Sequence, residues 1–412
     1  MYKFNPQLTT EKAKLLFKEE RAINHLEGWF IIKEEEQKAD AKYASLPPML
    51  RAAEKFREAV RVLPLSISDN SIFAGTQRDA FARSYALINP SFKVETFSGY
   101  CDPTAVYGDI EPNEEFTKER IERVREFSKK SAYVSALTEM YGNYENYTEE
   151  VAFFIEQVTG HIIPDFRPVL KYGLNTIIGE IDKKLEEETD AVRTENYKAF
   201  KVALNCALLL ANRYADIAAQ KAACAEGDRK QDFLRLEAAL RKVPAQKCES
   251  LFEAIQCYML LWELMCLEQA PNPFAFSVGN ADRVFEPYRA MENLSRDEAA
   301  ALLKHFLVFF NVGDRSWAIS QNLIVSGRDV EGNDLTNDTS YALLDAYFDM
   351  NLPQPILSVK LHKNTPDKVY EELGRFFFSP GVLTPSLFND DSVFKNLKDR
   401  NVAVCDLADD SI

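Results

Sequence analysis

From about residue 320 onward, short apolar runs alternate with stretches of helical periodicity. The apolar runs cover residues 321–327, 355–361, 383–389 and 402–405, and the helical stretches between them cover 341–348, 367–378 and 392–398. Short apolar runs bounded by turn residues are typical of buried strands. Strands that alternate with helices build a parallel sheet or barrel, whose functional loops follow the carboxyl ends of the strands. We therefore expect a catalytic loop directly after the last run, where this 412-residue sequence ends.

The preceding two-thirds of the chain are predicted to be mainly helical. Residues 1 to about 60 have helical periodicity with a break at 46–49, and amphipathic stretches follow between residues 114 and 241. Residues 64–115 are instead rich in Pro, Gly, Asn, Asp and aromatic residues, as in irregular segments that pack over a site or an interface. Since no linker or repeat interrupts the pattern, we predict one α/β body in three parts: a helical and irregular cap (1–110), a mainly helical part (111–319) and β/α units (320–412).

Two apolar helices of the middle part have a capping signal at their start. Ser250 and Ser295 each precede a glutamate by three residues, as in the capping box. The connection between these helices, residues 272–283, is rich in turn residues.

The charge and the cysteine content exclude several classes of protein. A formal net charge of -15 argues against a nucleic-acid partner, because phosphate binding needs a basic stripe. The start has no signal-peptide core and the apolar runs are too short and too charged to span a membrane. The seven cysteines contain no C-x-x-C pair and the four histidines lie far apart, so neither a disulfide framework nor a bound metal is predicted. We expect a soluble, cytoplasmic protein with reduced thiols.

Individual residues leave alternatives open. Asp406, Asp409 and Asp410 follow the last apolar run, where acidic residues serve as general acids, bases or metal ligands, or simply form a polar loop. His161 lies in a helix break, where a histidine either contacts substrate or caps a helix. Cys405 is expected to be a core residue, and residues 329–334 an Asn/Asp/Gly turn without the ligand spacing of an EF-hand. The common nucleotide, phosphate and hydrolase motifs are absent.

Several longer motifs occur in a specific order from about residue 150 to the end. Residues 322–341 have the pattern N-x-x-V-x-G-x-D-x-x-G-x-D-x-x-N-x-x-S-Y, and they continue into a helical stretch. Further motifs are G-H-x-x-P-D-F at residue 160, S-x-G-N-x-D at 277, P-x-L-F-N-D at 385 and the final stretch 401–410. Together they resemble the motifs of glycyl radical enzymes, the superfamily of pyruvate formate-lyase, choline trimethylamine-lyase and the diol dehydratases.

This resemblance implies a fold and a type of chemistry. The fold is half of a ten-stranded α/β barrel, built from two antiparallel five-stranded halves, with a large helical N-terminal portion. In the chemistry, a separate activating enzyme with S-adenosylmethionine and an iron–sulfur cluster converts a glycine near the C terminus into a radical. This glycyl radical oxidises a cysteine, and the thiyl radical takes hydrogen from a small substrate in anaerobic C–C, C–N or C–O cleavage. No further cofactor is expected to be bound.

The resemblance also indicates what these residues lack. Neither the cysteine motif Gly-Cys-x-Glu-Pro nor the glycine motif Arg-Val-x-Gly-Tyr occurs among them, and Cys405 does not match the radical cysteine. We therefore expect no catalytic residue in this chain and no activity of the chain alone, as for a truncated or split enzyme. Its expected partners are a C-terminal half or complementary subunit, the activating enzyme, a small-molecule substrate and a second copy in a homodimer.

A substrate pocket is the part of the site that the resemblance does assign to this chain. Its residues are His161, Phe274, Ala275, Gln321 and Asn322. His161 matches a substrate-binding histidine of some members. Phe274 and Ala275 replace a histidine and a serine that bind hydroxyls in diol-dehydratase-like members, which disfavours a polyol substrate. The arginine of the family's S-x-G-R motif is also replaced, by an asparagine.

Two other functions stay open at this point. A non-catalytic binding or assembly subunit is one alternative, because half a barrel exposes a sheet edge and an apolar face. A carboxylate-based hydrolase that uses Asp406 and Asp409 is the other.

Overall fold

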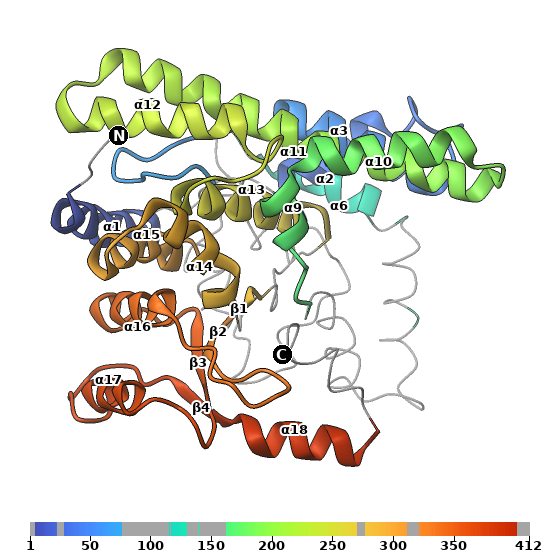
Figure 1. Cartoon of the computed structure of the whole chain (residues 1–412). Helices are drawn as coiled ribbons and strands as arrows, with labels where there is room; N and C mark the ends of the chain where they lie inside the picture. Colours follow the sequence, from blue (N-terminus) through green and yellow to red (C-terminus); the bar gives the residue numbers. More distant parts are fainter. Residues whose placement is uncertain are drawn as a thin grey trace.

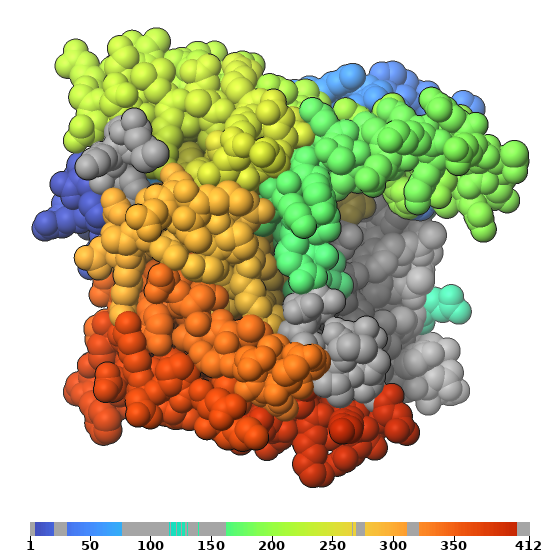
Figure 2. Space-filling model, in the orientation of Figure 1, coloured from blue at the N-terminus to red at the C-terminus, as the bar shows by residue number. Residues whose placement is uncertain are grey.

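The computed structural model describes residues 5–22, 29–75, 115, 117–128, 130, 139, 162–269, 277–310 and 321–401. A helical body contains most of the N-terminal two-thirds, and a parallel sheet with its helices contains the C-terminal third (Figure 1). In the space-filling view, this last third lies together on one side of the molecule, below the helical body (Figure 2).

The helical body consists of helices that the sequence pattern largely predicts. Their bounds are α1 (Pro6–Ala22), α2 (Trp29–Ala39), α3 (Pro48–Val62), α6 (Lys118–Ser128), α9 (Arg167–Tyr172), α10 (Leu174–Glu187), α11 (Ala191–Cys224), α12 (Gly227–Lys242), α13 (Leu251–Gln269), α14 (Ala281–Glu292) and α15 (Arg296–Phe309). The predicted break at residues 46–49 coincides with the turn before α3. Helix α3 packs against α11 and α1 packs against α15, so helices from the first 62 residues contact the middle of the chain.

The core of this body is built on α13 and α15. Their buried aromatic rings pack edge to face: the ring centroids of Tyr258 and Phe306 are 5.3 Å apart, and those of Trp262 and Phe310 are 5.7 Å apart. Aromatic pairs in this geometry add stability beyond the area they bury. At the start of α15, Ser295 and Glu298 form the predicted capping box. Before α13, Ser250 Oγ accepts the N–H of Glu253, but the Glu253 carboxylate accepts from Glu249 N rather than from Ser250 N.

In the described residues the sheet has four parallel strands in the order β1-β2-β3-β4. The strands are β1 (Gly279–Asn280), β2 (Asn322–Ser326), β3 (Ile356–Leu361) and β4 (Ser386–Asn389), and the associated helices are α16 (Asp338–Met350), α17 (Asp367–Phe377) and α18 (Asp390–Asp399). Three of the predicted strands and the three predicted helices are confirmed. Residues 402–405, the fourth predicted strand, lie outside the described residues.

Strand β1 was not predicted, because the turn-rich composition of residues 272–283 hides it. Two residues are too few to establish a period of two, and one of them is Gly279, with a φ of 73°. The strand forms because its backbone pairs with β2, with Gly279 opposite Leu323 and Asn280 opposite Ile324. Helix α14 then begins at Ala281, within the segment predicted as a connection.

The division of the chain into cap, helical part and barrel half stays a prediction. Within the described part of the chain, no helix is long and apolar enough to cross a membrane.

Candidate functional site

The sheet has two chemically different faces, because successive side chains of a strand point to opposite sides. One face is apolar and belongs to the main hydrophobic core; its central residues are Leu323, Val325, Leu357 and Val359. The opposite side, here called the polar face, carries Asn280, Asn322, Ser326, Ser358 and Lys360. Packing against the core requires apolar side chains on one face of the sheet only. It does not explain the polar residues on the opposite face, so the polar face is the first candidate for function.

Several oxygen atoms of the polar face have no hydrogen-bond partner within the described residues. These are Ser326 Oγ, Ser358 Oγ and Asn322 Oδ1, and both serines are at most 2% exposed. A buried polar atom without a partner costs about 1–3 kcal/mol, so native proteins keep few of them. Their grouping on one face of one sheet is typical of a surface that meets a ligand or another polypeptide segment.

At the amino ends of β1 and β2, the structure joins three segments that are far apart in the sequence. The backbone N–H of Ser277 donates to the carbonyl of Ile162 at 3.0 Å, and Ser277 Oγ accepts the N–H of Asn322, also at 3.0 Å. The carbonyl of Gln321 then accepts the N–H of Ile356 at 2.7 Å, which connects the start of β2 to the start of β3. In Figure 1 the residues that precede α9 run toward β1.

These contacts relate directly to the five residues predicted to bind substrate. Gln321 is fully buried and Asn322 is half-buried, and both lie at the start of β2. His161, Phe274 and Ala275 lie outside the described residues. However, Ile162 follows His161 directly in the chain and Ser277 comes two residues after Ala275, so the described ends of all three segments meet at this edge.

The carboxyl ends of the strands carry a network of buried charges. The fully buried carboxylate of Asp282 accepts the N–H of Ser326 at 2.7 Å and the hydroxyl of Ser340 at 2.5 Å. Burial raises the pKa of Asp282 above its ordinary value. Lys360 Nζ lies 3.8 Å from Asp390 Oδ1, and burial lowers the pKa of Lys360. The two hydrogen bonds of Asp282 tie α14 to β2 and to α16, and the Lys360–Asp390 ion pair lies between β3 and α18.

The long motif at residues 322–341 largely encodes this local structure. Asp329 Oδ1 accepts the N–H of Asn333 at 2.8 Å, which confirms an Asn/Asp/Gly turn at residues 329–334. Asn337 caps α16 by accepting the N–H of Ser340. At Gly327, φ is 94° and an added Cβ would lie 2.9 Å from the Asp390 carboxylate, so only glycine fits there. In the part of the chain that the structure describes, no three His, Cys, Asp or Glu side chains group as a metal site.

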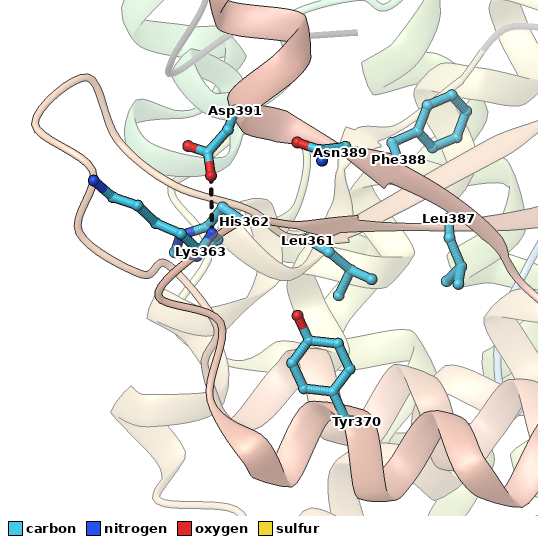
Figure 3. A pocket seen from close by; sticks show the side chains of 8 residues that line it. All are labelled: Leu361, His362, Lys363, Tyr370, Leu387, Phe388, Asn389 and Asp391. Carbon is cyan, nitrogen blue, oxygen red and sulfur yellow. Dashed lines mark hydrogen bonds between the residues drawn. The ribbon is translucent and has the colours of Figure 1, made fainter.

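A cavity of about 470 Å³ lies at the carboxyl ends of β3 and β4, next to α17 (Figure 3). It is lined by Leu361, His362, Lys363, Tyr370, Leu387, Phe388, Asn389 and Asp391. His362 Nε2 is 3.0 Å from Asp334 Oδ1, and the backbone N–H of Lys363 donates to Asp391 at 2.9 Å. Leu361 and Leu387 belong to the apolar side of the sheet, whereas Phe388 pairs with Lys360 and belongs to the polar face, so residues from both faces line this cavity.

The acidic residues predicted after the last strand, Asp406, Asp409 and Asp410, lie outside the described residues together with Cys405. The structure therefore does not test their predicted roles.

Comparison with known proteins decides the family. The family model described as "Pyruvate formate lyase-like" matches residues 4–412. The chain belongs to the pyruvate formate lyase-like family. The resemblance to glycyl radical enzymes that the motifs indicated is thereby confirmed.

Curated relatives of this family member are glycyl radical dehydratases and lyases. Trans-4-hydroxy-L-proline dehydratase of Clostridioides difficile is 26% identical over 396 residues, which cover 87% of this chain and 48% of that enzyme. (2S)-3-sulfopropanediol dehydratase of Klebsiella oxytoca is 24% identical over 267 residues, with coverages of 60% and 32%. The chain thus spans about half the length of the first of these enzymes, and the match covers about a third of the second.

A solved structure supports the same fold. The glycerol-bound, B12-independent glycerol dehydratase of Clostridium butyricum has a TM-score of 0.78 at 22% identity, and the match covers 97% of this chain and 53% of that one. The predicted fold, half of a glycyl radical enzyme barrel with a large helical N-terminal portion, is confirmed. The parallel sheet and the helical body described above correspond to that half.

Sequence reasoning missed two features of the site. Ser358 and Lys360 stand at alternate positions of an apolar strand, and this alternation was the available signal for a polar face. Ser277 begins the S-x-G-N-x-D motif, but the motif did not predict its contacts with residues 45 and 115 positions away.

Proposed function

We propose that this chain is the substrate-binding part of a glycyl radical dehydratase or lyase that acts on a small metabolite. The observation that carries the proposal is the convergence of the segments next to His161, Ala275 and Gln321 at the amino ends of β1 and β2. Family membership and the dehydratases and lyases among the relatives support the reaction class.

In this proposal the pocket comprises His161, Phe274, Ala275, Gln321 and Asn322. The Gln321 amide and the half-buried Asn322 side chain supply hydrogen bonds to substrate, and the His161 imidazole binds a polar group or moves a proton. Phe274 and Ala275 provide an apolar wall, so the substrate presents a carbon surface there rather than a second hydroxyl. A substrate radical also needs such a wall to exclude water.

The radical chemistry itself would come from outside these 412 residues. Neither the Gly-Cys-x-Glu-Pro nor the Arg-Val-x-Gly-Tyr motif occurs among them. The proposal therefore requires a polypeptide that carries both motifs and a separate activating enzyme with S-adenosylmethionine and an iron–sulfur cluster. The chain alone is expected to bind substrate without turnover.

A direct test measures ligand binding by the isolated chain. A panel that includes glycerol, trans-4-hydroxy-L-proline, isethionate and (2S)-3-sulfopropanediol is screened by saturation-transfer NMR, and any hit is measured by calorimetry. Gln321→Ala is expected to weaken binding of the hit by about tenfold, because one buried hydrogen bond is worth about 1–1.5 kcal/mol. Gln354→Ala, two residues before β3 and not one of the proposed pocket residues, serves as the control. Equal affinity of Gln321→Ala and the parent chain would contradict the proposed pocket.

A non-catalytic assembly subunit is the second candidate function. It is favoured by β4, whose four residues are all exposed at the edge of the described sheet. An open strand edge of this kind pairs readily with another polypeptide.

A further inference from the structure

His305 is a buried histidine of α15 that bonds to the N-terminal helix α1. Its Nε2 lies 2.9 Å from the carbonyl oxygen of Thr9, and the residue is 2% exposed. Because a carbonyl oxygen only accepts hydrogen bonds, Nε2 carries the proton and Nδ1 keeps a lone pair. In the part of the chain that the structure describes, Nδ1 has no hydrogen-bond partner. The neutral imidazole therefore suffices for the bond to α1, and a second proton on Nδ1 would find no acceptor there.

The charges around the imidazole disfavour an imidazolium ion. Lys12 Nζ of α1 lies 2.5 Å from the Asp232 carboxylate of α12, and Arg229 of the same helix lies 3.5 Å from that carboxylate. Asp232 attracts a positive charge on His305, but Lys12 and Arg229 repel it. The ring of Phe73, which is uncharged, packs edge to face against the imidazole. Burial lowers the pKa of His305 to about 4, although the hydrogen bond to α1 opposes this shift.

Helix α1 is attached to the body by polar contacts and a small apolar face, and it lies beside α15 (Figure 1). Thr10 Oγ1 accepts from Lys304 Nζ at 3.1 Å, and this ammonium group also pairs with Asp349 of α16 at 2.7 Å. Ala13 and Leu16 of α1 are buried in the core. A terminal helix held in this way can detach at a lower free-energy cost than global unfolding.

We propose that α1 and His305 form an acid-sensitive switch, in which protonation of His305 releases α1 from α15. The neutral imidazole fits the docked helix. The imidazolium ion is stable only after α1 has left, because Lys12 then moves away and water reaches the ring. Proton binding and docking of α1 therefore oppose each other. This inference does not rest on the proposed function.

The direction of the pH effect follows from this linkage. Release of α1 returns His305 to the ordinary histidine pKa of 6.5, so the released state binds more protons than the docked state between pH 6.5 and about 4. Docking is therefore strongest above pH 6.5 and weakens as the pH falls through this range. Between pH 7.5 and pH 5, the docking equilibrium constant is expected to fall by about 25-fold.

Hydrogen exchange measured by mass spectrometry follows α1 separately from the rest of the chain. Protection factors of the amides in α1 and in α11, each corrected for the intrinsic exchange rate, are measured at pH 7.5 and pH 5. In the parent chain, protection of α1 is expected to fall by about 25-fold, while protection of α11 changes by less than about threefold. An unchanged protection of α1, or an equal loss in both helices, would overturn the inference.

His305→Gln separates the switch from other effects of acid. The glutamine amide keeps a donor for the Thr9 carbonyl but takes up no proton, so protection of α1 should change by less than about threefold between the two pH values. His362→Gln is the matched control, because it replaces another buried, hydrogen-bonded histidine, and it should keep the parent pH dependence. The parent pH dependence in His305→Gln would contradict the switch.

Lys12→Gln tests the same switch if His305→Gln does not fold. Without this cation, the Asp232 carboxylate stabilises an imidazolium ion more strongly, so protection of α1 should depend less on pH than in the parent chain. Lys14→Gln, at an exposed position of the same helix, removes an equal charge and should behave as the parent does. Equal pH dependence in these two variants would count decisively against the switch.

Discussion

At the scale of single residues, Lys360 on the polar face shows that burial and a nearby charge have opposite effects on a pKa. Lys360 is 4% exposed, and its ammonium nitrogen lies 3.8 Å from Asp390 Oδ1. Burial of an ammonium group favours its neutral form and lowers its pKa, whereas the nearby carboxylate opposes this change. The lowered pKa of Lys360 is therefore a consequence of its place on the polar face.

This lowered pKa predicts a pH dependence of stability. Between the lowered pKa of the folded chain and the ordinary lysine pKa of 10.5, the unfolded chain binds more protons at this site than the folded chain. The free energy of unfolding of the parent chain should therefore rise relative to that of Lys360→Met as the pH increases toward 10. Urea unfolding of both proteins at several pH values measures the difference. A difference in unfolding free energy that does not change with pH would show that burial does not lower the pKa of Lys360.

At the scale of elements, capping residues join the sequence motif to the sheet. The Asn337 side chain accepts the N–H of Ser340, while Ser340 Oγ accepts the N–H of Asn337 and donates to Asp282. The start of α16 is therefore bonded to the residue that also holds the end of β2. This explains why asparagine and serine stand three residues apart in the motif.

Asn337→Ala should lower the free energy of unfolding by about 1 kcal/mol, the usual cost of a lost N-cap. Asn396→Ala, in the exposed middle of α18, is the matched control and should be neutral or slightly stabilising, since alanine favours helix. Denaturant unfolding measures both variants. Equal stability of the two would mean that the Asn337 cap contributes nothing.

The elements also show what the sequence could and could not predict. Residues 321–327, 355–361 and 383–389 were recognisable as strands because each is a short apolar run between turn residues. Strand β1 was not, because its pairing with Leu323 and Ile324 depends on residues more than 40 positions away. The same limit applies to the contacts of Ser277. Gln321 and Asn322 were found through a family motif and not through their chemistry.

At the scale of the whole molecule, the open edge of the sheet determines how the chain behaves alone. Two exposed apolar side chains, Leu387 and Phe388, belong to β4 itself, and Leu383 and the 88% exposed Phe378 precede this strand in the chain. Exposed apolar side chains on an edge strand favour association. The curated relatives are about twice as long as this chain, so additional polypeptide is the natural occupant of this edge in the proposed enzyme.

The isolated chain should therefore self-associate with rising concentration. Leu387→Lys places a charge on the edge strand and should shift the protein toward the monomer. Size-exclusion chromatography with light scattering measures both proteins, with the exposed substitution Val192→Lys on α11 as the control. A parent chain that is monomeric at all concentrations would contradict the role assigned to this edge.

The most direct test of the central claim is electron paramagnetic resonance of the chain under anaerobic conditions. The sample contains the activating enzyme and S-adenosylmethionine, with and without a polypeptide that carries the Gly-Cys-x-Glu-Pro and Arg-Val-x-Gly-Tyr motifs. The account predicts no glycyl radical doublet from the 412 residues alone, because they lack the glycine motif, and a doublet when the additional polypeptide is present. A doublet from the chain alone, or none from the combination with a competent activating enzyme, would contradict it.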